Sequence, residues 1–479
     1  MQPLSLNVPY RRAMLGRCLF IWLLQVVSNG LVPNHNADAF KSVKRSGLIV
    51  SWLDRLISLL FSGFARWDAV HFLHIAEFGY SFEQNLAFAP LYPFLIRLIT
   101  GIWTLFVSDD LLDFHSALLL TGFVVNVVFS CLSAQCIYNL TAAIYGNKSR
   151  ANVTLLLYLL NPATIFFLAC YSESLFAFLT FQGLCLLYDK HRSKAVRCFS
   201  ATLCFALSVL ARTNGLLNIG FVAYVLLDDA WRHRRDKQHC WTNLVENVCL
   251  GVACCLTFLV PYVTHSWIVY QTFCVAGSPH VHPLVSQLAK NEPSLVLPRQ
   301  LTNLTWCNMT LPLFYSTVQA KYWSVGLFGY FTVRKLPLFL LASPMLCIVA
   351  AVTRSSYRAI FTANPVASHG DQWITHCKIS LVPFVLHSAL LGALSFFCFN
   401  IEVVTRLLLA SNPVILWFLT DLFTLNAKTP MKFHSYWYVT LFEPLWQLAV
   451  SNLSKLVVIY FGAYIFVGTV LHVNFFPWT

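Results

Sequence analysis

Five ionisable side chains lie within twelve residues of the segment FARWDAVHFLHIAEFGY, which precedes an apolar segment long enough to enter a membrane. They are Arg66, Asp68, His71, His74 and Glu77. A carboxylate at the edge of a membrane can take a proton from a hydroxyl group, so this segment is a candidate for general-base chemistry. The alternative is structural, because Asp68 could instead cap the free N–H groups of the helix that follows it.

A second carboxylate, Asp38, lies thirty residues before Asp68, in the segment PNHNADAF. Each carboxylate has a histidine close by in the sequence, His35 for the first and His71 for the second. Inverting sugar transfer needs a base on the acceptor hydroxyl and stabilisation of the charge on the leaving group. If that group is a phosphate, an arginine suffices and no general acid is needed.

The same segment offers weaker alternatives. His71 and His74 are three residues apart, but no third ligand is within reach, so we predict no metal site and no cofactor. Trp67 at a membrane edge is also typical of an interfacial aromatic belt.

A polar break, ARTNG at residues 211–215, interrupts the apolar segment 198–230. Two short helices turning at this break would leave the basic loops on either side of the segment in the cytosol. Polar backbone at membrane depth is tolerated where it lines a cavity, so Arg212 and Asn214 are candidate site residues. An arginine that snorkels to the interface is the alternative.

Two further charged residues interrupt apolar surroundings. Glu173, in NPATIFFLACYSESLF, either caps a helix starting at Ser172 or Ser174 or faces a cavity, because facing lipid would cost free energy. Arg406 follows an expected loop at 399–403 and could bind phosphate through its planar fork. Its alternative role is that of an interfacial anchor.

The elements that must position these residues are apolar segments of membrane-spanning length. The chain has 479 residues, 58% hydrophobic and 11% charged, whereas soluble domains carry about 25% charged residues. Segments of about 20 apolar residues recur throughout. The composition therefore predicts an all-α polytopic membrane protein with one membrane domain, residues 1–479. The expected crossings are 15–33, 88–107, 116–138, 151–169, 172–188, 198–230, 247–270, 325–353, 379–399, 403–423 and 455–473.

The net charge of +13 comes largely from short basic loops, as the positive-inside rule predicts for cytosolic connections, and this argues against nucleic acid as a partner. Arg11, Arg12 and Arg17 before the first apolar segment resemble a signal anchor, with the chain after residue 34 across the membrane. We therefore expect two non-cytosolic loops, 34–87 and 271–324.

The crossings place YGNKSR (145–150) on the wrong side, so one segment between 88 and 150 must be misassigned. Most of the sixteen cysteines lie in apolar segments, so we predict no disulfide framework. Residues 426–452 suggest no chemistry. Six N-glycosylation sequons are present. The sequons lie at Asn139, Asn147, Asn152, Asn303, Asn308 and Asn452.

The string RWDAVHFLHIAEFGY…FAPLYP resembles the first luminal loop of GT-C glycosyltransferases, which use lipid-phosphate sugars. Further segments resemble one family in this class, the GPI mannosyltransferase 2 family. They are PNHNADAF, NPATIFFLACYSESLFA, ARTNGLL, YWSVGLFGYF (322–331), TRLLLASNPVILWF (405–418) and NFFPWT.

This resemblance implies a GT-C-like bundle of roughly 8–13 transmembrane helices in the endoplasmic reticulum, with a large first luminal loop. It implies dolichyl phosphate mannose as donor, the monomannosylated glucosaminyl-phosphatidylinositol precursor of GPI anchors as acceptor, and an inverting α-1,6 transfer in the lumen. By analogy Asp68 is the first candidate for the base and Asp38 the second. The candidate substrate-binding residues are Trp67, His71, His35, Glu173, Arg212, Asn214 and Arg406.

Other readings stay open at this point. Membrane lipids are expected partners, and a small membrane-protein subunit is a further candidate. A transporter or scramblase would show inverted repeats and charges near helix midpoints, and neither is visible in the sequence. A different GT-C enzyme with another acceptor is the closer alternative.

Overall fold

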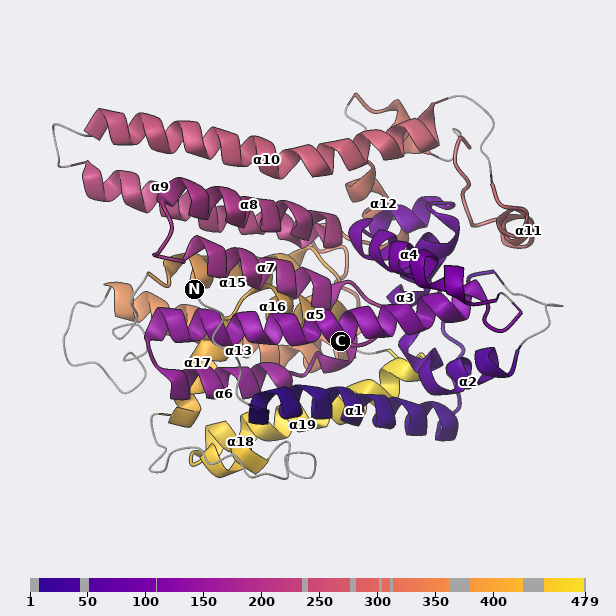
Figure 1. Ribbon diagram of the computed structural model, residues 1–479, viewed down its shortest axis with the longest axis horizontal. Coiled ribbons are helices and arrows are strands. Elements are labelled where there is room, and N and C mark those ends of the chain that lie inside the picture. The colour runs from indigo at the N-terminus through magenta and orange to yellow at the C-terminus, as the bar shows by residue number, and fades with distance from the viewer. Residues whose placement is uncertain are drawn as a thin grey trace.

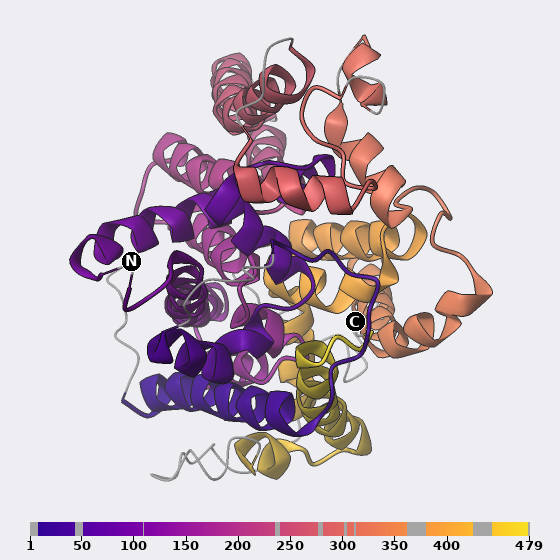
Figure 2. The same cartoon turned by 90° about the vertical axis from the view of Figure 1, so that its right-hand side faces the viewer.

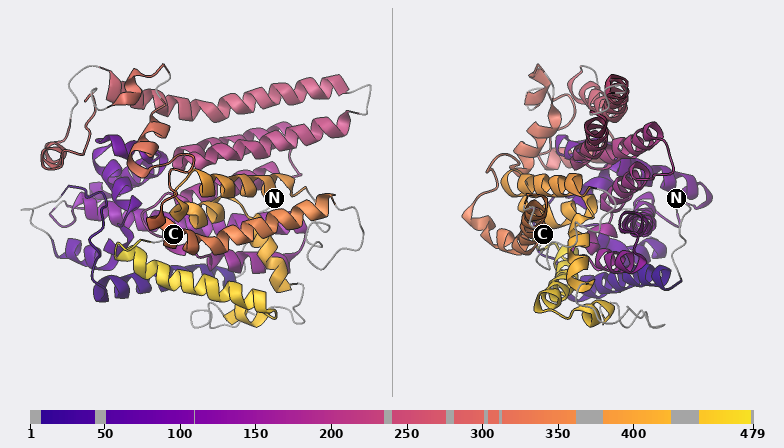
Figure 3. Two further views of the ribbon diagram at one scale, coloured as in Figure 1. Left: turned by 180° about the vertical axis from the view of Figure 1, so that it is seen from behind. Right: turned by 90° about the vertical axis from the view of Figure 1, so that its left-hand side faces the viewer.

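The computed structural model describes residues 8–43, 51–108, 110–234, 240–275, 281–300, 304–310, 313–361, 380–424 and 443–477. Within these ranges the chain forms α- and 3-10 helices and no strand. The long helices run side by side along the longest axis of the molecule (Figures 1 and 3). This confirms the all-α class that the composition predicts.

The long helices are α1 (Val8–Leu31), α5 (Phe114–Tyr145), α8 (Lys194–Ala211), α10 (Cys240–Cys274), α13 (Leu336–Phe361) and α19 (Asn452–Val473). Further helices are α6 (Lys148–Leu159), α7 (Glu173–Leu187), α9 (Ile219–His233), α15 (Val382–Phe397), α16 (Val404–Ser411), α17 (Val414–Thr424) and α18 (Glu443–Leu448). One end of the bundle, which we call the short-helix end and which faces the viewer in Figure 2, carries α2 (Trp52–Phe61), α3 (Asp68–Phe78), α4 (Leu91–Trp103), α11 (Pro283–Asn291) and α12 (Phe314–Trp323).

Helices of membrane-spanning length make the protein polytopic. In the described part of the chain, six helices are long and apolar enough to cross a membrane, and α16 with α17 forms a seventh candidate bent by 77°. Three more apolar helices have 10–17 residues: Leu91–Phe106, Glu173–Leu187 and Val382–Phe397. The described residues thus contain six candidate spans, or seven with the bent pair, and the predicted range of roughly 8 to 13 is reached only if shorter helices cross as well.

The misassigned segment is 88–107. It forms α4, whose 13 residues measure only about 20 Å, less than the hydrocarbon core of about 30 Å. α4 lies at the short-helix end beside α3 (Figure 2). Without this crossing, α1 and α5 return the chain to the end of the bundle where α1 begins, so residues 145–150 lie at that end (Figure 1).

The predicted hairpin at ARTNG is present. α8 ends at Ala211, the 3-10 helix η5 (Thr213–Asn218) makes the turn, and α9 runs back. Lys194 Nζ at the start of α8 lies 2.9 Å from Asp229 Oδ2 near the end of α9. The two helices are therefore antiparallel, and the hairpin tip with Arg212 lies far from both flanking loops.

Three further predicted crossings differ from the helices that form. In segment 151–169, α6 ends at Leu159, and the rest forms a turn and the 3-10 helix η4 (Thr164–Phe167). Segment 403–423 breaks into α16 and α17 because Pro413 cannot continue the first helix. Asn412 stabilises the break, since its Oδ1 accepts from the Val414 backbone N–H at 2.9 Å and its Nδ2 donates to the Phe384 carbonyl oxygen at 2.6 Å. Segment 325–353 becomes helical only near Val333, so residues 325–332 form a loop instead.

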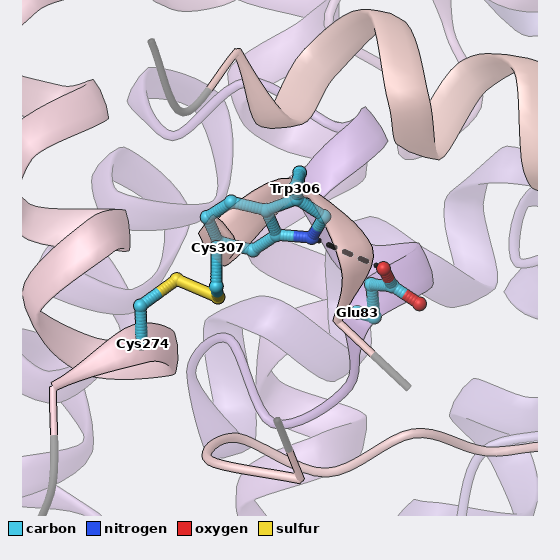
Figure 4. Close-up of a disulfide and its surroundings, with 4 residues drawn as sticks. All are labelled: Glu83, Cys274, Trp306 and Cys307. Carbon is cyan, nitrogen blue, oxygen red and sulfur yellow. Dashed lines mark hydrogen bonds between the residues drawn. A yellow bond between two sulfur atoms is a disulfide. The ribbon is translucent and has the colours of Figure 1, made fainter. Parts of the chain in front are cut away.

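A disulfide joins Cys274, at the end of α10, to Cys307 in the loop region 271–324 (Figure 4). The prediction of no disulfide is wrong for this pair, because Cys307 lies outside the apolar segments where cysteine acts as a small hydrophobe. Beside the disulfide, Trp306 Nε1 donates a hydrogen bond to Glu83 Oε1 at 3.1 Å (Figure 4). The two expected non-cytosolic loops, 34–87 and 271–324, are thus packed against each other. Residues 425–442, most of the unassigned segment 426–452, lie outside the described residues.

Candidate active site

Asp68 begins α3, and the residue before it has an unusual backbone conformation. Trp67 has a φ of +55°, which costs a bulky residue about 1–3 kcal/mol. The Tyr171 hydroxyl bridges the peptide groups on either side: it donates to the Arg66 carbonyl oxygen at 3.1 Å and accepts from the Asp68 backbone N–H at 3.2 Å. Tertiary contacts therefore fix the turn that positions Asp68.

The Asp68 carboxylate binds an arginine rather than a helix end. Its Oδ2 accepts a hydrogen bond from Arg406 Nη2 at 2.8 Å, and the side chain is 27% exposed. Among the described residues no hydrogen bond reaches Oδ1. The N-terminus of α3 has no side-chain cap, so the capping alternative for Asp68 is wrong.

Arg406 also binds a second carboxylate that is completely buried. Its Nη1 donates to Oε1 of Glu173 at 3.1 Å, and Nη1 of Arg212 lies 2.6 Å from the same oxygen. Two acids and two arginines thus form one network, in which each buried charge is paired. Neither role predicted for Glu173 is found: with 0% of its side chain exposed, it reaches no cavity, and it binds the two arginines instead of a helix end.

The electrostatics of the first loop favour an ionised Asp68. Burial by itself would raise the pKa of this carboxyl, but the Arg406 guanidinium brings the pKa below its ordinary value. Burial lowers the pKa of His71 to about 3. The His71 ring stacks between Phe40 and Phe88, with ring centroids 4.4 and 4.3 Å away. At neutral pH the site therefore holds a carboxylate beside an uncharged imidazole.

Asp68 and Arg406 line two cavities at once. The smaller cavity has a volume of about 370 Å³ and is largely apolar, although Arg212 at the hairpin tip also lines it. Its aliphatic and aromatic wall includes Phe72, Phe88, Leu216, Leu217, Leu391, Leu394, Phe399 and Leu407. We call it the apolar cavity.

The second cavity is larger and more polar, with a volume of about 980 Å³. Besides Asp68 and Arg406, it is lined by charged and hydrogen-bonding residues from both loop regions, from the segment before α13 and from the segment before α16. They include Asp38, His71, Tyr322, Tyr330, Arg334, Lys335 and Glu402. We call it the polar cavity. The two cavities share Asp68, Trp323, Asn400, Val403 and Arg406.

The structure brings most of the predicted residues to these cavities. Asp38, Trp67 and His71 line the polar cavity with Asp68, and Asn214 lines the apolar cavity beside Arg212. Asn214 Nδ2 also donates to Ser411 Oγ at 3.1 Å.

Two of the predicted substrate-binding residues line neither cavity: Glu173, which is buried in the ion-pair network, and His35. His35 is exposed and stacks on Phe476 at 5.2 Å between ring centroids.

His74 and Glu77, the remaining ionisable residues of α3, are held by contacts inside the short-helix end. His74 is fully buried, and its ring nitrogens lie 2.8 Å from Ser42 Oγ and 2.6 Å from Ser81 Oγ. Glu77 Oε2 lies 2.9 Å from His115 Nδ1. Both residues tie α3 to its neighbours.

Several residues of the site were not predicted. Tyr171 positions Asp68, and Trp323 lines both cavities while packing on His71 at 6.0 Å between ring centroids. Asn400 also lines both cavities. Tyr171 and Trp323 lie in the segments CYSES and YWSVGLFGYF, whose resemblance to a known family was the one available signal.

Comparisons with known proteins agree with this resemblance. A model of the mannosyltransferase (PIG-V) family matches residues 10–479. The GPI alpha-1,6-mannosyltransferase 2 of Cricetulus griseus is 31% identical, over 95% of this chain and 95% of its own length. The human GPI alpha-1,6-mannosyltransferase 2 is 29% identical over the same shares, and the GPI mannosyltransferase 2 of Drosophila pseudoobscura pseudoobscura is 31% identical over 96% and 97%.

Among solved structures, the apo Archaeoglobus fulgidus oligosaccharyltransferase covers 97% of this chain and 56% of its own, at 13% identity and a TM-score of 0.44. The membrane helices and the family match define a polytopic membrane glycosyltransferase. The chain belongs to the mannosyltransferase (PIG-V) family, since the match extends over nearly its whole length.

Proposed function

We propose that this protein transfers mannose from dolichyl phosphate mannose to the monomannosylated glucosaminyl-phosphatidylinositol precursor of GPI anchors. The new linkage is α-1,6 and forms with inversion. The family match and the names of the curated relatives support the reaction and the acceptor. The observation that carries the mechanism is that Asp68 lines an apolar and a polar cavity. One carboxylate can then face a lipid-linked donor and a glycan acceptor together.

The apolar cavity suits the donor. Its leucine and phenylalanine wall matches the first isoprene units of a dolichyl chain, and Arg212 offers a cation for the phosphate. Arg212 uses Nη1 on Glu173, and its other N–H groups make no hydrogen bond among the described residues. Arg406 uses both terminal nitrogens on carboxylates. Arg212 is therefore the principal phosphate contact, and Arg406 positions Asp68.

The polar cavity suits the acceptor glycan. A 6-hydroxyl group of its mannose reaches Asp68 Oδ1, which accepts the proton as the hydroxyl oxygen attacks C1 of the donor mannose. The C1–O bond to the phosphate breaks, and dolichyl phosphate leaves with the electron pair. Arg212 stabilises the added negative charge, so the step requires neither a general acid nor a metal ion.

We further propose that the short-helix end faces the lumen of the endoplasmic reticulum. The basic segment 189–197 lies at the opposite end of the bundle, beside Asp229, as expected for a cytosolic connection. Asn308, in a sequon, is exposed in the loop region that carries the disulfide. Disulfides and N-linked glycans both belong to the lumen.

The proposal is tested with the full chain in membranes of cells that lack the second GPI mannosylation step. These membranes receive dolichyl phosphate mannose with labelled mannose and a synthetic monomannosylated acceptor. We expect a dimannosylated product whose new sugar is released by an α-1,6-specific mannosidase. A chain that is present in the membranes but labels no acceptor would overturn the proposal. Labelling with a different linkage would overturn the assignment to this step.

A further inference from the structure

Two adjacent cations, Arg334 and Lys335, line the polar cavity together with Asp68. They belong to the 3-10 helix η7 (Val333–Lys335), which leads directly into α13. Lys335 Nζ lies 3.5 Å from Glu402 Oε1, and Tyr330 also donates to that oxygen. Arg334 is exposed, and in the part of the chain that the structure describes its guanidinium makes no hydrogen bond or ion pair.

The depth of this pair in the membrane indicates what it binds. The candidate span Val333–Arg358 begins at these residues, so they lie at the membrane–water interface, where phospholipid phosphates also lie. Cations at the end of a span usually anchor it to the surrounding lipid. Arg334 and Lys335 instead line a cavity that contains the candidate base, which favours a bound substrate lipid over bulk lipid.

We propose that Arg334 and Lys335 bind the phosphodiester of the acceptor glycolipid. This inference rests on the proposed function, in which the acceptor is a glycolipid. Its one phosphodiester lies at the membrane–water interface, and its glycan extends from there to the luminal side. The polar cavity, at about 980 Å³, is large enough to hold several sugar units between the cation pair and Asp68. Arg334 can hold two phosphate oxygens in its planar fork, whereas Lys335 adds a point charge.

This site is separate from the phosphate contact proposed for the donor. Arg212 lines the apolar cavity, whereas Arg334 lines the polar cavity, and neither arginine lines both. The two substrates of the transfer reaction each carry a phosphate. Two separate cationic sites would therefore let the enzyme recognise donor and acceptor independently.

The test compares two synthetic acceptors, the natural phosphodiester and its uncharged methylphosphonate analogue. The wild-type chain should use the phosphodiester with about tenfold higher kcat/KM, since a charged hydrogen bond contributes roughly one power of ten. Arg334→Gln should lose this preference through a higher KM for the phosphodiester, with an unchanged KM for the donor. Arg334→Lys should restore part of it. Arg354→Gln is the matched control, because Arg354 is an exposed arginine of the same span that lines neither cavity.

The outcomes separate this inference from the proposed function. A wild-type chain that labels both acceptors equally overturns the phosphate site but leaves the mannosyl transfer intact. An Arg334→Gln variant that keeps the tenfold preference does the same. A rise in the donor KM in that variant would overturn the acceptor assignment, because it would show that Arg334 binds the donor. If the wild-type chain labels neither acceptor, the proposed function itself fails.

Discussion

Asp68 and Glu83 are both acidic residues of the first expected loop, yet their surroundings differ completely. Glu83 is 1% exposed in its side chain, and both of its oxygens accept hydrogen bonds. Trp306 donates to Oε1, and Lys321 and Tyr322 donate to Oε2, at 2.5 and 2.8 Å. The Asp68 side chain is 27% exposed, and the only hydrogen-bonding partner of its carboxylate among the described residues is Arg406.

The comparison shows that burial of a charge does not by itself identify an active site. Glu83 has no oxygen left for a substrate, so its charge holds the segment 306–322 against the first loop. Asp68 keeps Oδ1 available and lines both cavities. An unsatisfied carboxylate oxygen that reaches a cavity distinguishes a candidate base from a structural residue.

The largest expected effect comes from removing the proton acceptor. Asp68→Asn should reduce mannosyl transfer by about 10²–10⁴-fold, because the amide cannot act as a base. The carboxamide oxygen can still accept from Arg406, so the unfolding temperature should change little. Transfer assays and thermal unfolding in detergent measure the two quantities. Near-normal activity in this variant would refute the role of Asp68.

Glu83→Gln should show the reverse pattern. The variant replaces charge-assisted hydrogen bonds to Lys321 and Tyr322 with weaker ones, at a cost of about 1–3 kcal/mol in the free energy of unfolding. Residual activity per folded molecule should remain within a few-fold of wild type. A loss of activity as large as that of Asp68→Asn, without loss of stability, would show that Glu83 acts in the chemistry.

A smaller effect is expected from acidification. Burial lowers the pKa of His71 and of His74 to about 3 each, whereas the unfolded chain takes up these protons near pH 6.5. The contribution of the two neutral histidines to the free energy of unfolding is therefore fully present above pH 6.5. It falls between pH 6.5 and pH 3, by up to about 1.4 kcal/mol per pH unit for each histidine.

Unfolding temperatures between pH 4 and 8 test this sign. His71→Gln should flatten the decline below pH 6.5, because the variant lacks one of the two buried imidazoles. A wild-type curve with no decline below pH 6.5 would contradict the neutral, buried state of these rings.

The smallest expected effect tests which side of the membrane the short-helix end faces. Asn308→Gln should remove one N-linked glycan and leave activity and stability unchanged, because Asn308 is exposed and lines neither cavity. Electrophoresis before and after glycosidase treatment shows the change in mobility. Asn147→Gln, at the opposite end of the bundle, is the control and should cause no shift. A shift only with Asn147→Gln would place the short-helix end in the cytosol.

The order of the membrane segments could be predicted because hydropathy is summed over neighbours in the chain. The break at Arg212 was also predictable, since polar residues interrupt an apolar segment there. The short helix α4 could not be predicted, because the apolar composition of its segment suits a membrane crossing as well as a short helix packed on α3. The Cys274–Cys307 disulfide was missed for a different reason: Cys307 lies outside the apolar segments, and its partner is 33 residues away in the chain.

The sequence by itself determined that this is a polytopic helical membrane protein, which segments are apolar, and which charged residues interrupt them. Only the tertiary structure decided which charges meet. Asp68 and Arg406 are 338 residues apart, and their pairing depends on how α3, α7 and α16 pack. Ion pairs and hydrogen bonds act over a few ångströms in space, whatever the separation in the chain, so the roles of Asp68, Glu83 and Glu173 became distinct only in the fold.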